Sequence, residues 1–265
     1  MVKKLFKHEV YALWRSMIPI WAILGGVSIL GRFIQLFEQE TVAYNIISGS
    51  AIFFYVVSLA ACIVCPFVYA ITRFHRNLFS GEGYLSFTLP VSTDQHILVK
   101  LVVAVMTQLV TLVAAALSVI IVTFGDLTVE IGKAIAYIFK LCVREWGAHL
   151  PLYMVEAGIG LIVLFAVETM LFYACICIGQ QSKKNRILAA VGAYFGIYAI
   201  QQVIGTIALL VGAEIDWEPL WTWVAEHPFA TVHIVLCGGI VLAALVGGLF
   251  YFISHRLISR RLNLE

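Results

Sequence analysis

The sequence predicts an all-α polytopic membrane protein, with a single transmembrane domain over residues 1–265 that contains six membrane-spanning helices. The first observation is composition: 62% of the residues are hydrophobic and 12% are charged, against about 45–50% and about 25% in soluble domains. A water-soluble core cannot hide this much apolar surface, so a bilayer is the expected solvent. The second observation is that six apolar segments each exceed the roughly 20 residues needed to cross the hydrocarbon core. We expect these spans at about residues 16–37, 46–71, 97–124, 150–179, 186–212 and 231–253.

A basic amphipathic helix is expected before the first span, over residues 1–15. Apolar residues recur there at helical spacing, with cationic residues between them. Such a helix typically lies along the inner membrane surface, in contact with lipid. The pair His8-Glu9 begins like a zinc-protease HExxH helix, but Ala12 stands where the second histidine belongs, so no metal site is predicted. The apolar positions are Leu5, Phe6, Val10, Leu13 and Trp14, and the cations are Lys3, Lys4, Lys7 and Arg15.

The basic residues are distributed asymmetrically between the two sides of the predicted spans. Of the 17 Lys and Arg residues, 13 fall at one set of ends, whereas the opposite loops are rich in Asp and Glu. The positive-inside rule therefore places both termini and the loops 72–96 and 180–185 in the cytoplasm. An even number of spans agrees with this orientation, and the other loops face outward.

Two of the outer loops are expected to be more than turns. In loop 125–149, Ile131, Ile135 and Ile138 fall on one face, which predicts a helix lying on the outer surface. In loop 213–230, tryptophans alternate with acidic residues. Tryptophans at an interface usually act as membrane anchors, and a lid over an exit path is the alternative interpretation.

The polar stretch between spans two and three, in loop 72–96, has a distinct internal pattern. Gly81 and Gly83 permit a sharp turn, and the mainly apolar segment that follows ends at Pro90. Ser92 or Thr93 can then cap the helix of span three, with Asp94 in its first turn. A short cytoplasmic helix with exposed apolar residues needs a protein groove or a lipid surface. We therefore expect this helix to receive force from a partner protein.

Three groups of residues in this stretch form a family pattern: Glu82-Gly83-Tyr84-Leu85, then Leu89-Pro90-Val91-Ser92, then Lys100 at the start of a long apolar span. The pattern resembles the coupling region of ABC-2-type transporter permeases, the membrane subunits of bacterial ATP-driven exporters. The resemblance extends to the whole plan, from the inner amphipathic helix to the six spans with both ends inside. The outer loop 125–149 is longer than in the simplest members of that family.

The resemblance implies that the helix in loop 72–96 is a coupling helix, which sits in a cleft of a separate nucleotide-binding ATPase subunit. Glu82 would make a polar contact with that subunit and the apolar residues would fill the cleft; docking on the membrane surface is the alternative. ATP and Mg²⁺ would bind to the partner, because the chain has no G-x-x-x-x-G-K-[ST] phosphate loop, and no cofactor of its own is expected. Two permeases, this chain twice or with a homologue, would join two ATPase subunits in the bacterial inner membrane. The implied coupling residues are Glu82, Gly83, Tyr84, Leu85, Phe87, Leu89 and Pro90.

Polar residues inside the spans form a second set of candidates. A carboxylate at the bilayer centre costs about 2.5–3.5 kcal/mol on insertion scales, so it should face protein or water. Glu156 lies near the outer end of span four and Glu168 lies roughly midway. Glu168 could bond to polar groups of neighbouring spans, line a route for a cationic cargo, or take part in a proton step. The polar groups considered are Gln108, Thr107, Gln201 and Gln202.

Span five carries the motif Gly192-x-x-x-Gly196, which allows another helix to approach closely. Packing within one subunit is one interpretation of this motif, and a seam between two permeases is the other.

The predicted function is that of a permease subunit that is not itself an enzyme and has no nucleic-acid partner. The aliphatic and aromatic spans favour an amphipathic or lipid-like cargo, such as a hydrophobic or antimicrobial peptide, an antibiotic or a lipid. The alternative is a non-transporting membrane sensor or assembly subunit of the same fold. Ser48-Gly49-Ser50 is a lone serine motif without a placed histidine, so little favours an intramembrane enzyme.

Overall fold

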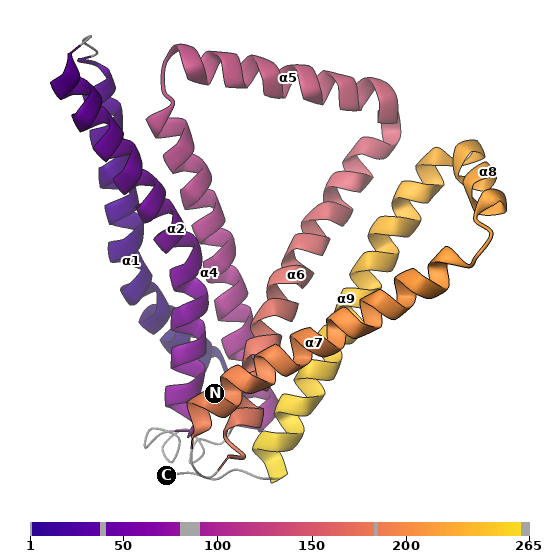
Figure 1. The fold of residues 1–265 in the computed structure, drawn as a ribbon. Helices are drawn as coiled ribbons and strands as arrows, with labels where there is room; N and C mark the ends of the chain where they lie inside the picture. The colour runs from indigo at the N-terminus through magenta and orange to yellow at the C-terminus, as the bar shows by residue number, and fades with distance from the viewer. Residues whose placement is uncertain (1, 38–40, 80–90, 183–184, 261–265) are drawn as a thin grey trace. The chain divides into compact units, whose positions relative to one another are not determined.

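The computed structural model describes residues 2–37, 41–79, 91–182 and 185–260, and every regular element in these ranges is a helix (Figure 1). Six of the helices in the described ranges are long and apolar enough to cross a membrane, which confirms the predicted all-α fold with six candidate spans. The six are α1 (Val2–Gln35), α2 (Val42–Phe79), α4 (Thr93–Val122), α6 (Leu150–Gly179), α7 (Arg186–Ala213) and α9 (Pro228–Arg260). Between them lie α5 (Asp126–Trp146), the short helix η1 (Gly147–His149) and α8 (Glu218–Glu226).

Helix α1 continues without a break from Val2 to Gln35, so the predicted boundary near residue 15 is not a helix end. Leu13 is buried in a cluster with Val99 and Val103 of α4, and the other apolar residues of the first turns pack at the edge of this cluster. The apolar face of the segment is therefore covered at least in part by protein. The position of this segment on the inner membrane surface stays a prediction.

Helix α4 ends at Val122, two residues before the predicted end of span three. The helix stops because Gly125 takes a φ of 127°, a left-handed conformation that suits glycine. A Cβ at this position would also lie 2.7 Å from the Nη2 atom of Arg32. The chain turns here and begins α5.

The chain divides into two compact units. Unit 1 consists of Met1–Arg73 and Gln95–Glu145, and unit 2 of Phe74–Asp94 and Trp146–Glu265. In unit 1, α1 and α4 run parallel. Leu13 of α1 packs against Val99 of α4, and further along both helices Trp21 Nε1 donates a hydrogen bond to Thr111 Oγ1 (3.1 Å). The α2 helix runs antiparallel to α4 beside it, with the Tyr55 and Ser118 hydroxyls 3.2 Å apart (Figure 1).

In unit 2, α6 and α9 also form a parallel pair. Small residues on one helix face larger residues on the other, so the two backbones approach closely. A Cβ on Gly160 would lie 3.5 Å from Ile240, and seven residues later a Cβ on Gly247 would lie 3.0 Å from Val167. A repeat of seven residues is the spacing of knobs-into-holes packing between parallel helices.

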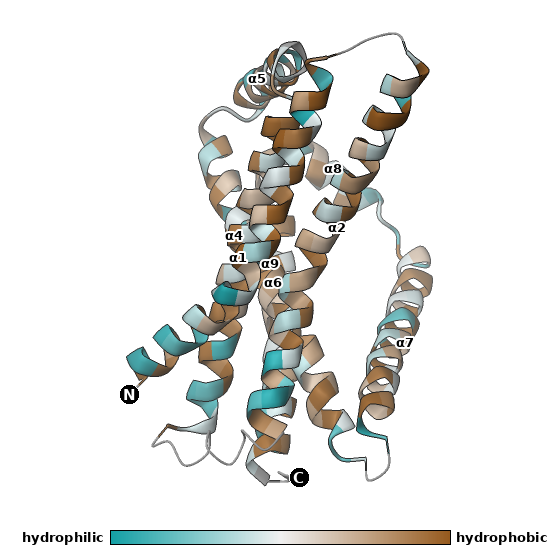
Figure 2. Cartoon of the chain, turned by 90° about the vertical axis from the view of Figure 1, so that its left-hand side faces the viewer, coloured by the Kyte–Doolittle hydropathy of each residue, from teal (hydrophilic) through white to brown (hydrophobic). Residues whose placement is uncertain are grey.

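Helix α7 meets α6 at Gly179, where only the hydrogen side chain of glycine fits. A Cβ on Gly179 would lie 2.6 Å from the Ala190 Cβ and 2.7 Å from the Arg186 carbonyl oxygen. At Gly192 and Gly196, by contrast, a Cβ would have nothing within 4 Å among the described residues. Close packing within the described chain therefore uses Gly179, and the face with Gly192 and Gly196 is open. Most of α7 is hydrophobic (Figure 2).

The helix predicted in loop 125–149 is present as α5, which runs from Asp126 to Trp146. Its isoleucines at 131, 135 and 138 are exposed, so their apolar face is not covered by the described chain. In loop 213–230 the tryptophans lie in and beside α8, and Trp217 Nε1 donates a hydrogen bond to the Gly212 carbonyl oxygen (2.6 Å). Both features suit an interface between lipid and water.

Candidate functional site

The predicted coupling residues lie outside the described residues. The ends of α2 and α4, which precede and follow these residues in the sequence, are described, and their contacts show how the two helix ends are held. Four side chains, here called the loop anchors, make these contacts: Arg73, His75, Asp94 and Lys100. The coupling residues outside the described ranges are Glu82, Gly83, Tyr84, Leu85, Phe87, Leu89 and Pro90.

In unit 1, a single carboxylate binds the loop anchors on both sides of the segment. Arg73 Nε, near the end of α2, donates a hydrogen bond to Glu9 Oε2 (2.6 Å). Lys100 Nζ, in the second turn of α4, donates to Glu9 Oε1, also at 2.6 Å. The side chains of Glu9 and Lys100 are each 5% exposed, and that of Arg73 is 24% exposed. Glu9 therefore holds α2 and α4 to α1 at the place where both helices meet the loop.

The burial of these three charges has a clear electrostatic basis. An unpaired carboxylate away from water loses its hydration without compensation, whereas contact with opposite charges and hydrogen bonds offsets much of that loss. Each oxygen of Glu9 has its own cation, so both receive a charge-assisted hydrogen bond. Removing the carboxylate would leave Lys100 buried without it, and the cluster is therefore sensitive to the loss of one member.

Glu9 was not among the residues predicted for a site, although the sequence contains a signal for it. It lies four residues before Leu13, and residues four apart share one face of a helix. Glu9 is thus an acidic residue on the apolar face of an otherwise basic helix. A charge at such a position needs a partner, but the sequence alone does not say which of the 17 cations supplies it.

In unit 2, the last turns of α2 pack against α6. The Phe74 and Tyr173 rings stack with centroids 3.8 Å apart and planes 7° from parallel, and both side chains are fully buried. One residue further, the His75 Nε2 and Gln180 Nε2 atoms lie at hydrogen-bond distance, 2.7 Å. The end of α2 is therefore held to α6 by a ring stack and a polar contact.

The start of α4 is held to α9 through Asp94. The Tyr251 hydroxyl donates a hydrogen bond to Asp94 Oδ1 (2.5 Å), and His255 Nδ1 lies 2.7 Å from the same oxygen. Asp94 also stands in the first turn of α4, as predicted, where a carboxylate interacts favourably with the helix dipole. Together, the loop anchors attach the two flanks of the segment to α1, α6 and α9.

The polar residues predicted within the spans do not form one group. Glu168 is exposed on α6, and the described residues offer it no hydrogen bond or ion pair. Gln201 and Gln202 are exposed on α7, where Gln202 Nε2 donates to the Tyr198 hydroxyl (3.0 Å), and Gln108 is buried in α4. Glu156 is paired with His233, a partner that the sequence did not indicate.

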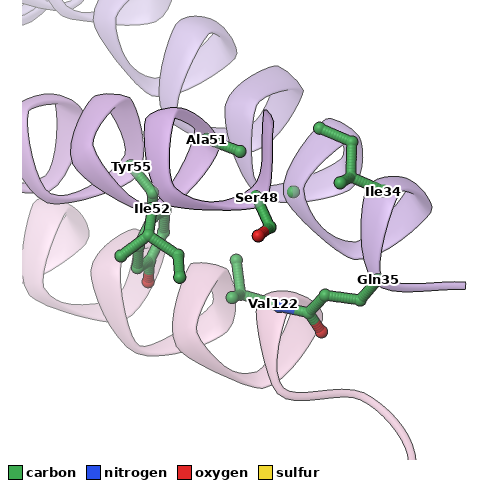
Figure 3. Close-up of a pocket in the computed structure, with 8 residues that line it drawn as sticks. Ile34, Gln35, Ser48, Ala51, Ile52, Tyr55 and Val122 are labelled. Carbon is green, nitrogen blue, oxygen red and sulfur yellow. The ribbon is translucent and has the colours of Figure 1, made fainter. Parts of the chain in front are cut away.

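The serine motif at residues 48–50 lies beside a small pocket in unit 1 (Figure 3). The Ser48 hydroxyl donates a hydrogen bond to the Asn45 carbonyl oxygen (3.3 Å) of its own helix. Among the described residues that line the pocket, none is a histidine or an acid, so no base activates this serine there. The lining residues are Gly31, Ile34, Gln35, Ser48, Ala51, Ile52, Tyr55 and Val122.

No protein-family model, curated protein sequence or solved structure matches this chain.

Proposed function

We propose that this chain is the membrane subunit of a bacterial ATP-driven exporter of the ABC-2 type. ATP is hydrolysed on a separate nucleotide-binding subunit, which pushes on the segment around Glu82–Leu89. Two permease copies, or this chain and a homologue, form the pathway in the inner membrane, with both termini in the cytoplasm. The sequence of the loop and the six apolar helices support this proposal.

The observation that carries the proposal is the attachment of the loop flanks. The α2 helix has 38 residues and α4 has 30, so each is a continuous rod through which a displacement can travel. At their loop ends, Glu9 ties both rods to α1 through buried ion pairs. Phe74 and Asp94 tie the same ends to α6 and α9. Within each unit, contacts of the described residues therefore join the loop ends of α2 and α4 to other candidate spans.

The first test is copurification with the ATPase. The chain is purified in mild detergent, as wild type and as Leu85→Asp/Phe87→Asp, and the bound proteins are identified. We expect an ATPase with the wild type and its loss with the variant. Crosslinking in native membranes before purification prevents dissociation by detergent. If no ATPase is captured after crosslinking, the exporter is excluded, and the sensor or assembly subunit becomes the better interpretation.

The second test separates coupling from folding. Glu82→Arg should abolish cargo-stimulated ATPase activity while membrane insertion and yield stay normal. Glu130→Arg is the matched control, since Glu130 is exposed on α5 and far from the loop in sequence. Normal stimulation in Glu82→Arg would contradict the coupling role of the segment.

We further propose an amphipathic or lipid-like cargo, with Glu168 beside its route. A carboxylate in the middle of a span that bonds to no described residue is expected to face water, a partner or a cargo. Glu168→Gln should then reduce transport of a cationic amphipathic peptide more than that of an uncharged lipid, whereas Glu130→Gln should affect neither. Equal reductions for both cargoes would refute the charge-specific role.

A further inference from the structure

A groove runs along the first half of α1, on the side of the helix that the contact with α4 leaves uncovered. Glu9, Leu13 and Met17 are buried and follow one another at intervals of four residues, so they form one face of the helix. Leu13 packs with Val99 of α4 on this face. The groove has a volume of about 800 Å³, within the range of about 300–1,000 Å³ that is typical of ligand sites. Its lining includes Lys7, Val10, Tyr11, Trp14, Arg15 and Ile18, all from α1.

The rest of the described chain does not neutralise the positive charge of this groove. Lys7 and Arg15 are exposed, and neither makes an ion pair with a described residue. Glu9, the one acid in α1, lies on the buried face. Its two oxygens there bind Arg73 and Lys100. The uncompensated cations of the groove therefore attract an anion from outside the described chain.

The spacing of the polar residues suits a phosphate group. Lys7, Tyr11 and Arg15 follow one another at intervals of four residues, so they lie along one side of α1. A phosphate at the level of Tyr11 would lie about 6 Å along the helix axis from each cation. Lysine and arginine are the side chains that commonly bind phosphate oxygens, and both are long enough to approach such a group from either side.

The polarity of the groove changes along α1 in the same order as that of a phospholipid. Cations line it from Lys7 to Arg15, and beyond them Ile18 is apolar and 55% exposed, where the predicted first span begins. Tyr11 and Trp14 lie between, and such rings are typical of the headgroup level of a bilayer. A free phosphate would leave the apolar part of the groove unused. We propose that this groove binds one anionic phospholipid, with its phosphate between Lys7 and Arg15 and an acyl chain along Ile18.

A specific site differs from the general attraction between a basic helix and an anionic membrane surface. In general attraction, every cation near the surface contributes about equally. In the proposed site, the phosphate contacts belong to Lys7 and Arg15. Lys3 and Lys4 are exposed on the same helix and do not line the groove. The two pairs carry equal charge, so they provide matched variants that distinguish a site from a charged surface.

The test measures lipid binding to the purified full-length chain by native mass spectrometry in detergent. Phosphatidylglycerol, which is anionic, and phosphatidylcholine, which is zwitterionic, are titrated with the same acyl chains. We expect one phosphatidylglycerol per chain, with a Kd at least about tenfold below that of phosphatidylcholine. Each cation near an anionic lipid contributes about fivefold in affinity, so Lys7→Gln/Arg15→Gln should raise the Kd of phosphatidylglycerol about 25-fold. Lys3→Gln/Lys4→Gln should raise it less than about threefold.

Two controls separate the site from misfolding and from a small-anion site. Lys7→Arg/Arg15→Lys keeps both charges and should retain binding. Glycerol phosphate, a headgroup without acyl chains, should not displace the lipid even in large excess. The proposal is overturned if the two glutamine variants weaken phosphatidylglycerol binding equally, if phosphatidylcholine binds as tightly, or if glycerol phosphate displaces the lipid. This test does not depend on the proposed transport function, since it needs neither an ATPase nor a cargo.

Discussion

Replacing Glu9 with glutamine removes the one carboxylate that Arg73 and Lys100 share, and it keeps nearly the same side-chain shape. Lys100, whose side chain is 5% exposed, then loses its ion pair with Glu9. Loss of one partner from a buried ion pair typically costs about 3–5 kcal/mol. Arg73 is 24% exposed and can turn toward water, so its contact adds at most about 1 kcal/mol. We therefore expect Glu9→Gln to lower the free energy of unfolding by about 3–5 kcal/mol, mainly through Lys100.

The measurement is reversible unfolding in mixed micelles, followed by tryptophan fluorescence. Glu130→Gln is the matched control, because it removes a charge from an exposed position and should change stability by less than about 0.5 kcal/mol. The double variant Glu9→Leu/Lys100→Leu removes both buried charges and should recover most of the loss, since apolar residues often replace buried ion pairs at little cost. A loss below about 1 kcal/mol for Glu9→Gln, or a double variant less stable than the single one, would refute the reasoning.

Three further substitutions test the packing and the loop attachment by the same unfolding measurement. Gly179→Ala places a Cβ 2.6 Å from the Ala190 Cβ and should lower the free energy of unfolding by about 1–3 kcal/mol. Gly192→Ala places a Cβ with nothing within 4 Å and should leave the free energy of unfolding unchanged or raise it by up to about 1 kcal/mol. Equal effects of the two substitutions would contradict the α6–α7 contact. Phe74→Ala removes one ring of a fully buried stack and should cost about 3–5 kcal/mol, whereas Phe124→Ala, at a side chain 65% exposed, should cost less than about 1 kcal/mol. Tyr251→Phe removes the hydrogen bond to Asp94 and should cost about 0.5–1.5 kcal/mol, and no change would show that this anchor is not formed.

The helices could be predicted from the sequence because each is a local property. An apolar run longer than the bilayer core identifies a span without any knowledge of its neighbours, and the predicted span 150–179 coincides with α6. Local signals also explain the end of α4 at Val122, shortly before Gly125, and the amphipathic character of α5. The helix boundary expected near residue 15 is not found, because hydropathy changes near residue 16 while the backbone hydrogen bonds of α1 continue.

The site could be predicted only in part because its contacts join residues far apart in the sequence. Lys100 stood out at the start of span three, but its partner Glu9 lies 91 positions away, and Arg73, which shares this partner, lies 64 positions from it. The pair Glu156–His233 spans 77 positions. Periodicity says which face of a helix a charge occupies, and it does not say which other helix that face meets. Such pairings follow from the packing of α1 with α4 and of α6 with α9.

The parallel arrangement of α1 and α4 has a consequence for how the chain is made. Glu9 leaves the ribosome 91 residues before Lys100 and 64 residues before Arg73. At about 5–20 residues per second, α1 waits roughly 5–18 s for the lysine. During that interval its acidic side chain has to remain near water or in the insertion machinery, since lipid offers it no counter-charge. The ion cluster therefore closes only once the loop and Lys100 have been made, and a chain truncated before residue 100 would lack its ion pair with Lys100.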